Sequence, residues 1–418
     1  MHHRQRILLP IIFIFQLAFN LSISAGNWPT WRGPSGNGIA QEETAPLQWS
    51  TEKNVQWKTA LPGPGNSSPV VWGDRVFITS SQDKGKRRSL VCFHRKNGKL
   101  LWQKDVRYER TETTHKTNPQ CSASPTINGD VVAVHYGSAG SHAYDLNGKL
   151  LWKRTDLGTI DHIWGYSSSP VPYRNTFIQY VGPGTKVSIV ALDSKTGKTI
   201  WQRQLPDAEA KKPDQFLGAW GTPLLRKNRT RDELILGLPK KILSIDPATG
   251  EDQWNCTGLG PLVYTNPLAS GDKVFAMSGY HGAAIGVKVP AGVSGDITSK
   301  RIWTSQKKPP QRIGSGIAVD QHIYILNEPG IATCIRMENG EEVWKERVGK
   351  GNSWGSMSLV ANRIYVTNTL GQTLVLAPSP KFKLLATNPL EEMTRGSPAF
   401  SDGKVFIRTY KHLWCIGE

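Results

Sequence analysis

The sequence is organised around a short motif in which a tryptophan follows a glycine by four residues. Five copies occur along the 418 residues, at Gly98–Trp102, Gly148–Trp152, Gly197–Trp201, Gly250–Trp254 and Gly340–Trp344. Trp57 and Trp303 occupy the same position within their repeats but lack the preceding glycine. Seven of the 15 tryptophans therefore share one periodic position. Self-similarity at roughly 20–50 residues is the signature of a repeat architecture. The chain is therefore expected to form one repeat domain.

A second signature marks the start of each repeat. A small polar residue, often followed by proline, precedes an apolar pair, a polar turn and a β-branched run. The eight starts are Ser68, Ser124, Ser169, Thr222, Asn266, Ser315, Ser356 and Ser397, with spacings of 41 to 56 residues. Each unit reads as four short strands joined by Gly-Asp, Asn-Gly or Thr-Gly turns, which suit hairpins. This pattern predicts an all-β protein, an eight-bladed β-propeller with four-stranded antiparallel blades.

The two ends of the repeat region complement each other. The last unit contains only three strands, and residues 54–58 supply the strand that it lacks. We therefore expect the N- and C-terminal strands to pair in one blade, which removes the free sheet edges of a linear array. Seven blades are the alternative, because the last two copies of the motif are degenerate.

The chain divides into three parts by composition. Residues 1–25 combine a basic start, an apolar run and small residues near Ala25, which is the pattern of a signal peptide. An uncleaved N-terminal anchor is the alternative. Residues 26–53 are expected to pack on the propeller as an extension, and residues 54–418 to form it. The protein is thus expected to be periplasmic or secreted, not membrane-spanning after cleavage, and a monomer. Export makes nucleic acid an unlikely partner despite a net charge of +18.

Two segments resemble a known family. Residues 191–201 (ALDSKTGKTIW) and 244–250 (SIDPATG) are similar to the tryptophan-docking motif of the PQQ-like, or quinoprotein-like, β-propellers. The resemblance implies that the aspartate and glycine shape a turn and that the tryptophan packs between blades. This blade-docking role would fall to Trp57, Trp102, Trp152, Trp201, Trp254, Trp303 and Trp344. The segment Trp28–Pro34 further resembles secreted bacterial members of the family.

The family contains both enzymes and binding proteins. Its quinoprotein dehydrogenases carry adjacent cysteines, a Glu/Asn/Asp calcium set and an aspartate base, and none of these can be matched here by motif. No C-x-x-C or H-E-x-x-H occurs either, so no metal is expected. We therefore expect no cofactor, no catalytic residue and a BamB-like scaffold that binds a protein or another envelope component. A PQQ-binding oxidoreductase with calcium is the alternative.

The candidate binding site is the mouth of the central channel. The residues just before the blade starts are expected to ring this opening with aromatic and cationic groups. They are Asn66, Trp164, Tyr166, Trp220, Tyr264, Arg312, Trp354 and Arg395. Such groups suit sugars or anionic planar ligands. The alternative is that these side chains pack the seams between blades.

Two further features bear on partners and redox state. A basic cluster at Lys84, Lys86, Arg87 and Arg88 suggests a second ligand class, an anionic or sulfated glycan or an anionic lipid component. Cys92, Cys334 and Cys415 occupy the same inward strand position in different blades, and Cys121 and Cys256 lie in connections two blades apart. We expect no disulfide, because such cysteines are poorly placed for a bridge.

Overall fold

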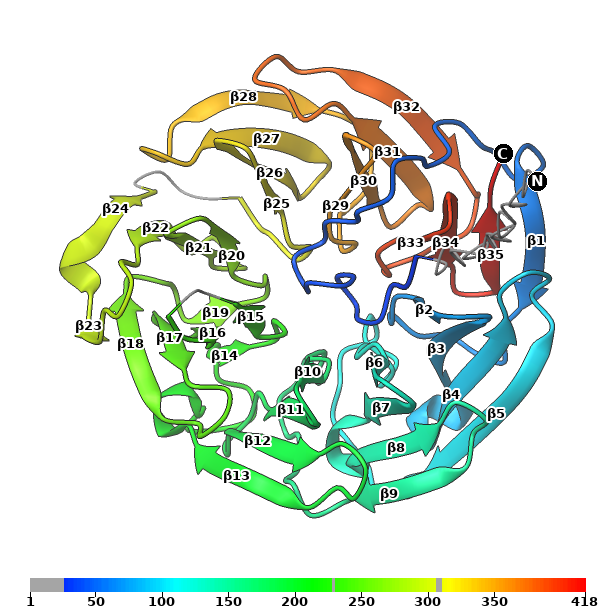
Figure 1. Cartoon of the computed structure of the whole chain (residues 1–418), viewed down its shortest axis with the longest axis horizontal. Coiled ribbons are helices and arrows are strands. Elements are labelled where there is room, and N and C mark those ends of the chain that lie inside the picture. The colour runs from blue at the N-terminus through cyan, green and yellow to red at the C-terminus, as the bar shows by residue number, and fades with distance from the viewer. Residues whose placement is uncertain (1–25, 228–229, 306–309) are drawn as a thin grey trace, which may run out of the picture.

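The computed structural model describes residues 26–227, 230–305 and 310–418, and its strands form eight antiparallel blades around a central axis (Figure 1). The prediction of an eight-bladed propeller is confirmed, and the seven-blade alternative is wrong because the two degenerate copies form complete blades. The proposed signal peptide lies outside the described residues. No helix among the described residues is long and apolar enough to cross a membrane. Their helices are 3-10 turns: η1 (Asp83–Gly85), η2 (Gly137–Ala139), η3 (Pro206–Ala208) and η4 (Thr298–Lys300).

Each blade runs from a short inner strand at the axis to an outer strand at the rim. In blades 1 to 4 the strands are β2 (Val70–Trp72), β3 (Arg75–Gln82), β4 (Arg87–His94) and β5 (Leu100–Arg107); β6 (Thr126–Asn128), β7 (Val131–His135), β8 (Ser141–Asp145) and β9 (Leu150–Arg154); β10 (Val171–Tyr173), β11 (Thr176–Val181), β12 (Ser188–Asp193) and β13 (Thr199–Gln204); β15 (Leu224–Arg226), β16 (Glu233–Leu238), β17 (Lys241–Ile245) and β18 (Asp252–Thr257).

Blades 5 to 8 repeat the arrangement. Their strands are β20 (Leu268–Ser270), β21 (Lys273–Met277), β22 (Ala284–Lys288) and β24 (Arg301–Thr304); β25 (Ile317–Val319), β26 (His322–Asn327), β27 (Ile331–Arg336) and β28 (Glu342–Arg347); β29 (Ser358–Val360), β30 (Arg363–Thr367), β31 (Gln372–Leu376) and β32 (Leu384–Pro389); β33 (Ala399–Ser401), β34 (Lys404–Arg408), β35 (His412–Ile416) and β1 (Val55–Ala60). The short strand β23 (Gly295–Asp296) adds to the edge of blade 4, and β14 (Gly218–Ala219) pairs in parallel with β19 (Leu262–Val263).

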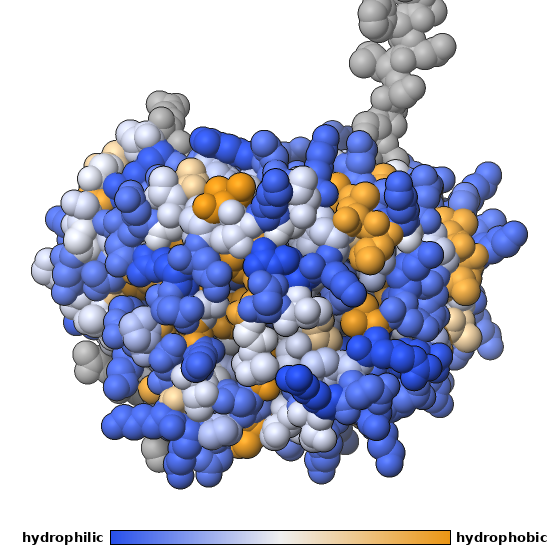
Figure 2. Space-filling view, turned by 90° about the horizontal axis from the view of Figure 1, so that it is seen from below, coloured by the Kyte–Doolittle hydropathy of each residue, from blue (hydrophilic) through white to orange (hydrophobic). Residues whose placement is uncertain are grey.

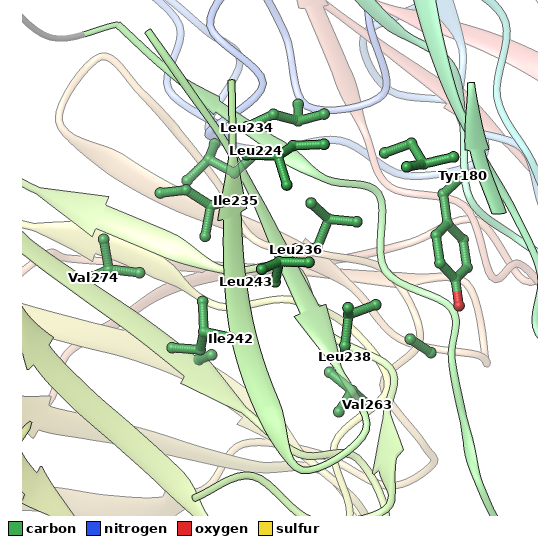
Figure 3. Close-up of a cluster of buried hydrophobic side chains, with 14 of the residues drawn as sticks. Tyr180, Leu224, Leu234, Ile235, Leu236, Leu238, Ile242, Leu243, Val263 and Val274 are labelled. Atoms are coloured by element: carbon green, nitrogen blue, oxygen red, sulfur yellow. The ribbon is translucent and has the colours of Figure 1, made fainter. Parts of the chain in front are cut away.

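The core lies between the faces of neighbouring blades. The middle strands are continuous buried runs, as in β16, where all six residues are buried, because both faces of each blade are covered. Figure 3 shows one such seam, where Tyr180 of blade 3 faces leucines of blade 4 including Leu224 and Leu238. The outer strands are more exposed, and the rim is mostly hydrophilic with separate hydrophobic patches (Figure 2). All five cysteines are buried and free.

Strand β1 closes the ring by pairing with β35, with Trp57 opposite Cys415 and Ala60 opposite His412. The first and last strands of the chain therefore lie side by side in blade 8 (Figure 1). A polar cluster joins the same elements. Glu392 accepts hydrogen bonds from Thr409 at 2.6 Å and His412 at 2.7 Å, and Lys58 of β1 lies 3.3 Å from the same carboxylate.

The closing cluster predicts a specific dependence of stability on pH. Burial opposes ionisation of Glu392, but hydrogen bonds from Thr409 and His412 hold its pKa below the usual value. A carboxylate with a lowered folded-state pKa stabilises the fold above its unfolded pKa of about 4.3 and ceases to do so as the pH falls through the folded value. Glu392→Gln is therefore expected to reduce the loss of stability below about pH 4.3. Urea denaturation at several pH values measures this, and an unchanged acid slope would contradict it.

A closed belt of hydrogen bonds links all eight blades near the axis. At each blade start, the backbone N–H donates to the side-chain oxygen of the next start, at 2.8 or 2.9 Å. The order is Ser68, Ser124, Ser169, Thr222, Asn266, Ser315, Ser356, Ser397 and back to Ser68. A small side chain with an acceptor oxygen is thus needed at every start, which explains why this position repeats along the sequence.

The belt predicts the effect of removing one hydroxyl. Thr222→Val keeps the side-chain shape but leaves the buried Ser169 N–H without its acceptor. An unsatisfied buried donor costs about 1–3 kcal/mol of folding free energy. The urea midpoint is expected to fall accordingly, whereas Thr387→Val on the exposed outer strand β32 serves as a matched control. Equal effects of the two substitutions would show that the belt does not stabilise the ring.

The repeated tryptophans join each blade to the next. Six of the seven donate the indole N–H to a backbone carbonyl of the following blade at 2.8–3.1 Å. Gly197 shows why glycine accompanies them: its φ is +69°, and a Cβ there would lie 2.7 Å from the Trp152 ring. Trp254 differs, since its indole N–H donates to Glu233 at 2.9 Å. The following blade lacks the glycine turn, and the β23 segment occupies that edge instead.

Candidate functional site

The N-terminal segment crosses the centre of the ring (Figure 1). Trp28 pairs with Val71 of blade 1, Pro29 accepts a hydrogen bond from Ile127 of blade 2, and Ala40 donates to Leu359 of blade 7. Gly33 makes this path possible, because its φ is +76° and a Cβ would lie 2.8 Å from the Trp28 ring. These contacts give the Trp28–Pro34 segment its structural role, which is to span the channel.

A cavity of about 590 Å³ lies on the channel axis. Trp31 of the crossing segment contributes to its wall and donates its indole N–H to Ser397 of the belt at 3.2 Å. Ser169 of the belt also lines the cavity. The volume lies within the range of roughly 300–1,000 Å³ that is usual for small-molecule sites.

The structure brings six of the eight predicted channel-mouth residues together in this cavity: Asn66, Trp164, Trp220, Tyr264, Trp354 and Arg395. Five of these six stand two residues before a belt residue. The same position in the other three blades is held by Ser122, Ser167 and Ile313, and these also line the cavity. The eight positions that precede the belt by two residues therefore all face the ligand space.

Tyr166 and Arg312 do not line the cavity, and their placement there was wrong. Both precede a belt residue by three positions, and successive side chains of an extended chain point in opposite directions. Tyr166 is buried and donates its hydroxyl to the Gln120 carbonyl at 2.7 Å. Arg312 is buried beside the Ser278 and Gly282 carbonyls, and burial lowers the pKa of Arg312 to about 10. For these two residues the packing alternative is correct.

Sequence reasoning missed several other wall residues, which come from loops of differing length. They are Trp31, His115, Thr117, Asn118, Phe216, Tyr280, Gln311 and Asn352. Gln311 and Asn352 each stand four residues before a belt residue, and Asn118 and Phe216 each stand six before one. The counting included neither position, and the other four residues share no position. The position two residues before the belt would have identified Ser122, Ser167 and Ile313.

One wall of the cavity is a packed aromatic cluster. The Trp164 ring lies 5.6 Å from Trp220 and 5.2 Å from Phe216, and Trp220 lies 5.1 Å from Tyr264. Buried His162 supports this cluster with its ring 4.9 Å from Trp220. Burial lowers the pKa of His162, so the imidazole is neutral at pH 7 and packs as an aromatic ring.

The opposite wall holds the cationic group of the site. The Arg395 guanidinium lies 4.8 Å from the Trp354 ring and 5.3 Å from the Tyr410 ring. Arg395 also donates a hydrogen bond to the Tyr410 hydroxyl. Trp354 donates its indole N–H to Glu328 at 2.8 Å, and burial raises the pKa of that carboxyl group. These contacts hold the arginine and Trp354 in place.

The wall does not match the chemistry of a calcium–quinone centre. Among the described residues that line the cavity, none is Asp, Glu, Lys or Cys. Calcium prefers several carboxylate or carbonyl oxygens. Within the described ranges, no group of three or more His, Cys, Asp or Glu side chains could hold a metal ion. The residues present therefore do not fit PQQ with calcium as the family's dehydrogenases hold it.

The predicted basic cluster is largely neutralised by acidic neighbours. Arg88 is buried and lies 3.2 Å from the buried Glu112 carboxylate, so it is not part of a surface patch. Arg87 pairs with Asp83 at 3.2 Å, and Lys86 lies 3.7 Å from Glu109. A more cationic groove of about 500 Å³ lies between blades 1 and 2, and its lining includes Arg107, Arg110 and Lys153.

Fold and site together define a closed eight-bladed propeller with a ligand-sized aromatic cavity on its axis. A family model described as "Outer membrane protein assembly factor BamB" matches residues 46–159 and 164–346, more than two thirds of the chain. The chain belongs to this PQQ-like β-propeller family.

Solved structures share the fold at low identity. BamB from Moraxella catarrhalis is 14% identical, with a TM-score of 0.62, over 86% of this chain and 96% of that protein. The quinohemoprotein alcohol dehydrogenase from Comamonas testosteroni is 11% identical, with a TM-score of 0.70, over 94% and 81%. A polyvinylalcohol dehydrogenase from Sphingopyxis sp. (strain 113P3) is 24% identical over 202 residues, 44% of this chain. That match covers 29% of the dehydrogenase, so this chain spans less than a third of its length.

Proposed function

We propose that the protein is an exported, non-catalytic propeller that binds a cell-envelope component in its axial cavity. The observation that carries this proposal is the cavity wall, whose described residues supply aromatic, amide and hydroxyl side chains but no carboxylate or thiol. Such a wall provides binding surface and hydrogen bonds but no pair of carboxylates for acid–base catalysis and no thiol nucleophile. The signal-peptide pattern at residues 1–25 supports export. Membership of a family described as an outer-membrane assembly factor supports a scaffold role in the envelope.

Two exposed aromatic residues of the cavity allow a direct test. Phe216 and Tyr280 are 57% and 50% exposed, so replacing both with alanine leaves the core intact. Each protein is immobilised and exposed to envelope extract. The double variant is expected to capture about ten-fold less of the bound component than the unaltered protein does. Leu150→Ala combined with Ile200→Ala removes similarly exposed apolar side chains from the rim and is the matched control. Equal capture by all three proteins, or no capture by any, would contradict the proposal.

A quinone-dependent oxidoreductase is the second candidate, favoured by the dehydrogenases among the similar proteins. The cavity wall argues against it for the reasons given above. PQQ added with calcium is therefore expected to cause no saturable quenching of tryptophan fluorescence. Trp31, Trp164, Trp220 and Trp354 all line the cavity, so binding there would be detected. Saturable quenching at micromolar PQQ would overturn this assignment.

A further inference from the structure

We infer that the ligand of the axial cavity is an uncharged, polyhydroxylated ring, a residue of a neutral oligosaccharide. This inference rests on the proposed binding function and specifies the chemistry of the ligand. It differs from the anionic ligands that the net charge of +18 suggests. Three properties of the wall support it: its charge, its unpaired polar groups and its exposed aromatic surface.

The cavity wall contains little free charge. Of the described residues that line it, Arg395 and His115 can carry a positive charge, and none is Asp or Glu. Arg395 is already stacked between Trp354 and Tyr410, and His115 is hydrogen bonded to Thr117 at 2.8 Å. Recognition of sulfate or carboxylate normally uses several free Arg or Lys side chains. The cations that the composition provides gather elsewhere, for example in the groove with Arg107, Arg110 and Lys153.

The polar groups of the wall fall into two sets. Asn66 and Asn118 are saturated, since their amides bond to Thr117, Ser122, Trp164 and Tyr166. Four side chains in blades 5 to 7 have no hydrogen-bond partner among the described residues: Tyr264, Tyr280, Gln311 and Asn352. Amide and phenol groups can both donate and accept hydrogen bonds. Sugar hydroxyls also do both, so this set is complementary to a ring that carries several hydroxyls.

The aromatic cluster supplies the apolar half of the recognition. Phe216 and Tyr280 are large aromatic side chains left about half exposed beside the cavity. Exposed apolar surface concentrated at a cavity marks a ligand or partner site. Sugar rings present C–H groups on one face and hydroxyls at the edge, so they can contact an aromatic wall and unpaired amides at once. Trp164 and Phe216 would contact the apolar face while Gln311 and Asn352 bond to the hydroxyls.

Calorimetric titration with defined sugars tests this inference. The probes are maltotriose and chitotriose as neutral sugars, and a chondroitin-sulfate oligosaccharide as the anionic one. We expect saturable binding of a neutral trisaccharide that is unchanged between about 0.05 and about 0.5 M salt, because no ion pair forms. Gln311→Ala and Tyr280→Phe are each expected to weaken it about five- to ten-fold through loss of one hydrogen bond. Gln202→Ala, an exposed amide on the outer strand β13, is expected to have no effect.

Two results would overturn the inference. One is that neither neutral sugar binds up to about 10 mM, where even weak contacts are detectable. The other is that only the sulfated sugar binds, with an affinity that falls as salt rises and that Gln311→Ala does not change. If neutral sugars fail while capture of an envelope component still requires Phe216 and Tyr280, the ligand class is wrong and the binding function stands. If that capture also fails to depend on the cavity, both are wrong.

Discussion

Replacing Trp152 with alanine is expected to lower the free energy of unfolding by about 3–5 kcal/mol, the usual cost of removing a buried tryptophan. Trp152 of blade 2 is 7% exposed and belongs to a buried cluster that includes Phe177, Val190 and Leu192 of blade 3. Its indole N–H also donates to the Ser194 carbonyl at 2.8 Å. The substitution therefore creates a cavity in one seam and leaves a carbonyl unpaired.

Two further variants separate packing from hydrogen bonding at this seam. Trp152→Phe keeps much of the ring contact and loses the N–H, so it is expected to cost about 1–3 kcal/mol. Leu150→Ala, two residues earlier on the same strand β9, removes a side chain that is 47% exposed and is expected to cost under about 1 kcal/mol. Urea denaturation of the three variants measures the series. An equal fall in the free energy of unfolding for Trp152→Ala and Leu150→Ala would show that the tryptophan does not join the blades.

The buried pair of Arg88 and Glu112 predicts a second large effect. Both side chains are 1% exposed, with Arg88 Nη1 and Glu112 Oε1 3.2 Å apart. Glu112 also accepts a hydrogen bond from the Ser138 backbone N–H at 2.7 Å. Glu112→Gln leaves the arginine charge buried without its counter-ion, and breaking a buried pair in this way costs about 3–5 kcal/mol. The urea midpoint is expected to fall accordingly.

A double variant distinguishes loss of the charge partner from loss of shape. Arg88→Met combined with Glu112→Leu removes both charges and is expected to recover most of the stability lost by Glu112→Gln. His115, Thr117 and Asn118 follow Glu112 on the same loop and line the cavity. Glu112→Gln is therefore also expected to weaken ligand binding. A stability within about 1 kcal/mol of the unaltered protein would show that the pair does not anchor this loop.

The site was only partly predictable from the sequence. A shift of one residue along the chain explains why two of the predicted residues do not line the cavity. Counting back from the repeated blade starts placed Trp220, Tyr264, Trp354 and Arg395 at the cavity, and the structure has them there. The same counting placed Tyr166 and Arg312 there one residue too early, where an extended chain turns its side chain away from the axis. Gln311 and Asn352 stand one full strand period further back, a position that the counting did not include. Tyr280 lies in a loop between β21 and β22 and has no repeated position from which to count.

The sequence by itself determined the number of blades and the way in which they join. Local rules suffice for both, because a glycine turn, a docking tryptophan and a small polar start recur in each unit and act between neighbours. Only the tertiary structure decided what surrounds the axis. The cavity combines single residues from blades far apart in the chain with Trp31 from the crossing segment, and no local pattern records their meeting. The location of the positive charge was also decided by the tertiary structure. The chain carries a net charge of +18, but folding keeps most of these side chains away from the cavity, because buried positive groups need partners.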